Sequence, residues 1–152
     1  MGNQRMSQTR LRAWLATVIW ALAGAGFFLA FFSGGGVDEF DTDSGRHLVG
    51  AAFIAFGFVA HWTSLWITRR REGQVTMDER DFQVVARAGQ ATLIIVLVAI
   101  FGFNIGLWTI YEGAGVVAVG WMWFLAYGCL FLAYVIHALA VLILDGRTSG
   151  HG

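Results

Sequence analysis

The chain has 152 residues, of which 57% are hydrophobic and only 13% are charged, and its mean hydropathy is +0.64. This composition is too apolar for an ordinary soluble domain and indicates a membrane protein. The absence of Lys excludes Schiff-base chemistry, and the single Cys129 excludes an intramolecular disulfide relay. The formal net charge of zero says nothing about partners, and no nucleic-acid partner is predicted.

Four apolar stretches are long enough to cross a membrane, which takes about 20 apolar residues in a helix. They run from Trp14 to Phe32, Leu48 to Thr68, Ala91 to Tyr111 and Val117 to Leu144. The fourth is longer than a span requires, so either it tilts or its first turn lies in the interface. The sequence therefore predicts an all-α fold, a four-helix transmembrane bundle that forms one integral membrane domain over residues 1–152.

The first span and the loop after it have contrasting compositions. The span carries small residues that allow neighbouring helices to approach closely, so we expect it to be packed on two sides. Ser33 to Gly36 predicts a flexible exit, and several carboxylates follow it. Asp41 to Gly45 is similar to the start of a calcium loop, but the later bidentate Glu is missing, which favours a solvated acidic loop.

Charge is distributed asymmetrically around the four spans. All ten basic residues are Arg, and nine of them fall on one side of the four-span arrangement, while only Arg46 falls on the other. By the positive-inside rule, both termini and the hairpin 69–90 are predicted to be cytoplasmic, with the protein in a prokaryotic inner membrane. The lipid bilayer is thus the first predicted partner.

The charged hairpin leads directly into the third span. Thr76 and Glu79 have the spacing of a capping box, whose side chains satisfy the first free amides of a helix, so one helix is predicted from Thr76 to about Tyr111. Met77-Asp78-Glu79-Arg80-Asp81 resembles the Asp-Glu-Arg signature of an uncharacterised family of small prokaryotic multi-span membrane proteins. The resemblance covers about Arg69 to Tyr111. It implies a helical inner-membrane protein and supplies no catalytic residue.

The same hairpin is the candidate contact for a membrane or cytoplasmic protein partner. The residues proposed for that contact are Asp78, Glu79, Arg80 and Asp81. Helix capping and pairing of the carboxylates with Arg69 to Arg71 explain them equally well, and exposed pairs of that kind contribute only about 0–1 kcal/mol each.

The third span contains a predicted packing seam, whose members recur alternately every four and three residues. They are Ala88, Thr92, Ile95, Ala99, Gly102, Gly106 and Thr109. Gly102 and Gly106 favour an intramolecular helix contact, and the alternative is a homo-oligomer formed through them. Asn104 lies off the seam and is expected to hydrogen-bond to a neighbouring helix.

The two halves of the chain also share a weak repeat. Arg12-Ala13-x-x-Ala16-Thr17 at the start of the first span matches Arg87-Ala88-x-x-Ala91-Thr92 at the start of the third. Such matches also arise by chance in Ala-rich spans. We favour a duplicated two-helix hairpin, whose two copies would be related by a pseudo-two-fold axis along the membrane normal.

Two intramembrane histidines are the most specific chemical feature. His61 lies eight residues before Arg69, and His137 lies eight residues before Asp145. Because both spans run inward, a rise of about 1.5 Å per residue puts both imidazoles at the same depth, roughly 12 Å inside the cytoplasmic boundary. One hypothesis is that His61 and His137 are the axial ligands of a b-type haem.

The surroundings of the two histidines leave a second interpretation open. Each imidazole could instead hydrogen-bond across helices to Ser64, Thr92, Tyr134 or a trapped water. Under the haem hypothesis, Trp62 and Tyr134 are the expected neighbours of the ligands. No metal other than the haem iron is predicted.

The function classes are constrained mainly by what the sequence lacks. It contains no hydrolase, nucleotide-binding, thiol-redox or metalloprotease motif. No Asp or Glu lies inside a predicted span, which counts against a small-molecule transporter driven by protons. The leading hypothesis is a non-enzymatic accessory or scaffold protein, the alternative is a b-type haem electron carrier, and a transporter is less favoured.

Overall fold

The computed structural model describes residues 8–72 and 79–149, and nearly all of them lie in helices. The long helices are α1 (Gln8–Phe32), α3 (Ser44–Glu72), α4 (Glu79–Tyr111) and α5 (Gly120–Ser149), and α2 (Val37–Thr42) is short. Within the described residues there is no strand. All four long helices are long and apolar enough to cross a membrane. The predicted all-α four-helix transmembrane fold is therefore confirmed.

The helix ends differ from the limits of the predicted apolar spans. α1, α3 and α4 begin earlier, because their polar first turns continue the helix. α5 begins at Gly120 and not at Val117, so the connection after Tyr111 is longer than a tight turn. Gly115 in this connection has φ +67°, a conformation that glycine adopts without strain. The predicted start at Thr76 lies outside the described residues, as does its capping box.

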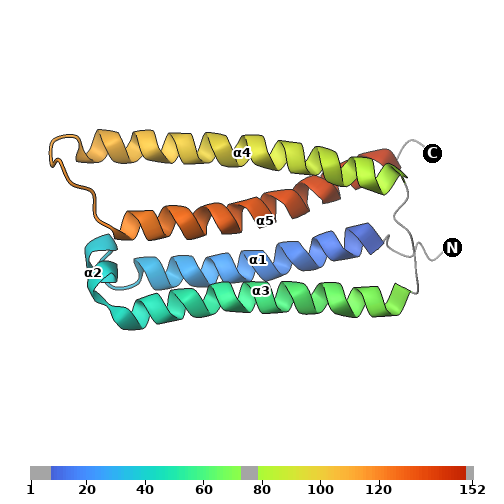
Figure 1. Cartoon of the computed structure of the whole chain (residues 1–152), viewed down its shortest axis with the longest axis horizontal. Helices are drawn as coiled ribbons and strands as arrows, with labels where there is room; N and C mark the ends of the chain where they lie inside the picture. Colours follow the sequence, from blue (N-terminus) through green and yellow to red (C-terminus); the bar gives the residue numbers. More distant parts are fainter. Residues whose placement is uncertain (1–7, 73–78, 150–152) are drawn as a thin grey trace.

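The long helices are antiparallel in succession, and α1 and α5 occupy the middle of the arrangement (Figure 1). α1 packs against both α3 and α5, as its small residues predicted, and α4 packs against α5. α3 and α4, as described, do not form a packed pair. A two-fold axis relating the two hairpins would bring α3 against α4 just as α1 meets α5. The predicted pseudo-two-fold symmetry is therefore wrong.

The core is built around α1, because glycines let its aromatic rings and those of its neighbours interlock. A Cβ atom on Gly26 of α1 would overlap the Phe53 ring of α3. A Cβ atom on Gly57 of α3 would lie 2.8 Å from the Trp20 ring of α1. Trp20 is fully buried, and its ring stacks on Tyr134 of α5 with the centroids 4.0 Å apart. Rings from three helices thus meet at α1, which explains its central position.

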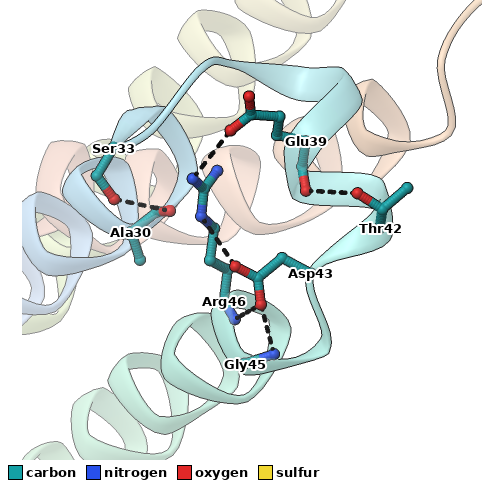
Figure 2. Close-up of polar contacts among 7 residues, drawn as sticks. All are labelled: Ala30, Ser33, Glu39, Thr42, Asp43, Gly45 and Arg46. Carbon is teal, nitrogen blue, oxygen red and sulfur yellow. Dashed lines mark hydrogen bonds and ion pairs between the residues drawn. The ribbon is translucent and has the colours of Figure 1, made fainter.

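α2 closes the end of the bundle opposite the chain termini (Figure 1). Its Phe40 is buried, with the ring centroid 4.5 Å from that of Phe31 in α1. Figure 2 shows the Arg46 guanidinium of α3 between Glu39 and Asp43, at nitrogen–oxygen distances of 3.4 and 3.3 Å. The segment expected to be a flexible acidic loop is therefore ordered by one apolar anchor and one arginine.

The packing seam of α4 agrees with the prediction only near the end of the bundle that holds the termini. There, Ala88 and Thr92 are buried, and Ala88 packs with Ala13 of α1 and Val141 of α5. Val84, Ala88 and Thr92 recur every four residues, so the contact stripe rotates around α4 as the helices cross.

Toward the α2 end, this rotation moves the α4 contact away from the predicted glycines. The Phe103 ring lies 5.6 Å from that of Phe124, and the Trp121 indole donates a hydrogen bond of 2.8 Å to the Tyr111 hydroxyl. Gly102 and Gly106 are exposed, with no atom within 4 Å of a Cβ built on either. The intramolecular contact predicted for these two glycines is therefore wrong.

Candidate cofactor site

His61 and His137 line the same cavity, although they come from α3 and α5, which do not pack against each other as a pair. The cavity has a volume of about 250 Å³, and all four long helices contribute to its wall. Ala13 and Ala16 of α1, the helix between α3 and α5, also line it. Because these two side chains are short, both imidazoles reach a common space.

Neither imidazole makes a hydrogen bond within the described part of the chain, and the His61 Nδ1 atom is buried without a partner. The hydroxyls considered as partners are used inside their own helices. Ser64 donates to the His61 carbonyl at 2.7 Å, and Thr92 donates to the Ala88 carbonyl at 2.7 Å. The interpretation in which Ser64 or Thr92 bonds the imidazoles is therefore wrong.

The cavity wall carries positive charge and, among the described residues, no carboxylate. Arg12 and Thr9 of α1 line it together with the two histidines. The Arg12 Nε donates a hydrogen bond of 3.3 Å to the Thr68 hydroxyl of α3, which fixes the side chain between the two helices. Arg12 is thus a fixed cation in a cavity that suits an anionic group.

Aromatic rings surround His61. Tyr134, an expected neighbour, lines the cavity, and its ring centroid lies 5.4 Å from that of His61. Trp62, the other expected neighbour, does not line the cavity and is 64% exposed, so that prediction is wrong. Trp20 takes its place, with its ring 6.1 Å from His61 and its buried indole nitrogen without a partner. Its position well inside the first span, away from the interfacial belts, was the available sequence signal.

The charged hairpin is only partly described. Asp78 lies outside the described residues, as do the side chains of Arg70 and Arg71, so their predicted pairing stays a prediction. The Arg80 guanidinium lies 3.8 Å from an Asp145 carboxylate oxygen, and Asp145 is buried. At least one of the proposed contact residues therefore links α4 to α5 within the chain.

Residues 15–143 match a family described as a predicted membrane protein family, DUF2178. The matched range covers most of the chain and includes both cavity histidines. The chain belongs to the DUF2178 family. Its resemblance to an uncharacterised family of multi-span membrane proteins is thus confirmed. No curated protein and no solved structure matches the chain.

The region matched to DUF2178 also contains a second, larger cavity of about 350 Å³ between α1, α4 and α5. Its lining is apolar and includes Phe103, Phe124, Gly128 and Cys129. No His, Tyr or charged side chain reaches it. It suits a lipid chain, whereas the smaller cavity carries the groups capable of acid–base or ligand chemistry.

Proposed function

We propose that the protein is a b-type haem electron carrier with His61 and His137 as the axial ligands. The observation that carries this proposal is that both imidazoles line one cavity and neither has a hydrogen-bond partner among the described residues. Buried polar groups normally have partners, and ionisable residues inside a membrane are costly to keep. A ligand that binds both imidazoles accounts for both residues.

The chemistry of the cavity fits a haem group. Two imidazoles on separate helices of a bundle are a suitable axial pair. Arg12 supplies a positive charge suited to a propionate, and Ala13, Ala16 and Ala138 keep the walls short. No carboxylate among the lining residues opposes an anionic ligand.

The size of the cavity sets a condition on haem binding. Its volume of about 250 Å³ is below the range of about 300–1,000 Å³ that is usual for ligand pockets. The macrocycle therefore enters only if helices move apart. α3 is the helix that moves at least cost, because α1 is the only long helix against which it packs.

Bound haem supplies reversible one-electron transfer at its iron. In this arrangement His61 and His137 hold the iron from two sides, and Arg12 binds a propionate. Tyr134 and the buried Trp20 fix the ring of His61 and keep water away from it. The polypeptide thus contributes ligands, charge compensation and an apolar boundary.

An absorption spectrum of the detergent-purified protein tests the proposal. Protein expressed with ample haem is expected to show a Soret band and, on reduction, the sharp bands of a six-coordinate low-spin haem. His61→Ala and His137→Ala are each expected to abolish that form. His47→Ala is the matched control, because its imidazole nitrogen is also buried without a partner but its ring lies against Phe40 and Trp123 near α2.

Two results would overturn the haem proposal. One is a colourless protein despite ample haem, with the helix content of the folded chain. The other is a red protein whose spectrum is unchanged by both cavity substitutions.

The proposed setting is a prokaryotic inner membrane with both termini in the cytoplasm. The Arg distribution supports this orientation, since Arg46 alone lies in the loop region near α2 while the other nine fall in the termini and the central hairpin. The accessory or scaffold hypothesis stays a prediction. Its test is a partner pull-down with and without Asp78, Glu79 and Asp81, in which unchanged partners would remove the hairpin from it.

A further inference from the structure

Asn104 is a polar side chain on the exposed surface of α4, near the middle of the apolar span. Its Nδ2 donates a hydrogen bond of 2.8 Å to the Ile100 carbonyl of its own helix. This is its only hydrogen bond within the described residues, so its Oδ1 accepts none. The neighbouring helix contact expected for Asn104 is therefore wrong for a single chain. The hydrocarbon core holds no water that could donate instead, so the missing donor must come from another molecule.

Asn104 also belongs to a regular stripe along α4. The stripe recurs alternately every four and three residues and consists of Leu93, Leu97, Ile100, Asn104, Leu107 and Tyr111. This is the spacing of a coiled-coil seam, in which a single Asn fixes register and oligomeric state. Leu93 and Leu97 are 61% and 55% exposed, so no part of the chain covers this half of the stripe.

We propose that two copies of this chain associate in the membrane through α4, with the Asn104 side chains of the two copies hydrogen-bonded to each other. A two-fold axis along the membrane normal brings identical residues to the same depth. Because an amide carries both a donor and an acceptor, the two side chains satisfy each other. A different partner would need its own polar group at this depth, whereas a second copy has one by necessity.

This surface differs from the glycine pair that the sequence indicated. A helix turns about 100° per residue, so Asn104 lies roughly 160° around α4 from both Gly102 and Gly106. The association therefore uses the side of the helix that carries the polar group, and the glycines remain toward lipid.

Cysteine cross-linking in membranes distinguishes the two sides of α4. In a Cys129→Ala background, Leu97→Cys tests the stripe. Ile95→Cys is the matched control, because it is 45% exposed and lies on the glycine side. A membrane-permeable oxidant is expected to give disulfide-linked dimers from Leu97→Cys and not from Ile95→Cys. Dimers from Ile95→Cys alone, from both variants equally or from neither would overturn the proposal.

A second measurement tests the amide pair itself. Energy transfer between labelled copies in lipid vesicles gives the dimer dissociation constant, which Asn104→Leu is expected to raise roughly 3-fold to 20-fold. Because Asn104 contacts only its own helix, this change leaves packing within the chain intact. Asn104→Gln should retain association, and Gly102→Ile should leave it unchanged. An unaltered dissociation constant for Asn104→Leu would contradict the proposal.

Discussion

At the scale of single residues, glycines set how closely the two central helices and α3 approach. Gly26 leaves the space that the Phe53 ring occupies, and Gly57 leaves the space beside Trp20. Any side chain there would separate α1 from α3 and leave a void beside the rings. These glycines therefore act through packing, because Gly in a helix interior is otherwise unfavourable relative to Ala.

Replacing Gly26 by Ala is expected to destabilise the fold by about 1–3 kcal/mol, because the new Cβ overlaps the Phe53 ring and forces neighbours to move. Unfolding in mixed detergent, followed by circular dichroism, measures the change. Gly102→Ala is the matched control, since nothing lies within 4 Å of its Cβ position. It should be neutral or slightly stabilising, because Ala favours helix. Equal losses in the two variants would show that the Phe53 contact is not the cause.

At the scale of elements, α2 exists because Phe40 has somewhere to be buried. A helix of six residues is far too short to be stable by itself. The Phe40 ring lies 4.5 Å from Phe31 and 4.6 Å from His47, centroid to centroid, so α2 is held by both α1 and α3. The Arg46 ion pairs contribute less, because both carboxylate partners are about half exposed or more.

Phe40→Ala is expected to cost about 3 kcal/mol and to release α2 first. Hydrogen exchange should show faster exchange of α2 amides, including the Phe40 amide that donates to the Gly36 carbonyl. Arg46→Gln is the comparison and should cost about 0–1 kcal/mol. If Arg46→Gln loosened α2 more than Phe40→Ala, electrostatics and not burial would hold this element.

At the scale of the whole molecule, the bundle has two edges that differ in use. α3 at one edge carries the cavity histidine His61, and α4 at the other presents an unpartnered polar stripe. Both edges keep one side toward lipid because α3 and α4 do not close against each other. A ligand and a second copy can therefore act on opposite edges without competing.

Labelling in intact cells tests the proposed orientation of the whole molecule. In a Cys129→Ala background, Asp43→Cys near α2 should react with a membrane-impermeant maleimide added from outside. Glu79→Cys, exposed at the opposite end, should react only after the cytoplasmic face is opened. Labelling of Asp43→Cys from the cytoplasm alone would reverse the topology.

The sequence by itself determined the number of spans, the even topology and the likeness in depth of the two histidines. These properties depend on local hydropathy and on the constant helical rise, so no distant contact is needed to find them. Tyr134 followed from the same reasoning, because it lies one helical turn from His137.

Only the tertiary structure decided which faces of the helices meet. The rotation of each helix about its axis depends on side chains from distant segments, and the local pattern does not encode their fit. For that reason the seam of α4 moved from Gly102 to Phe103, Trp20 replaced Trp62 beside His61, and Phe40 turned an acidic loop into α2. The short Ala13 and Ala16 of α1 brought His61 and His137 to one cavity, which equal depth alone does not ensure.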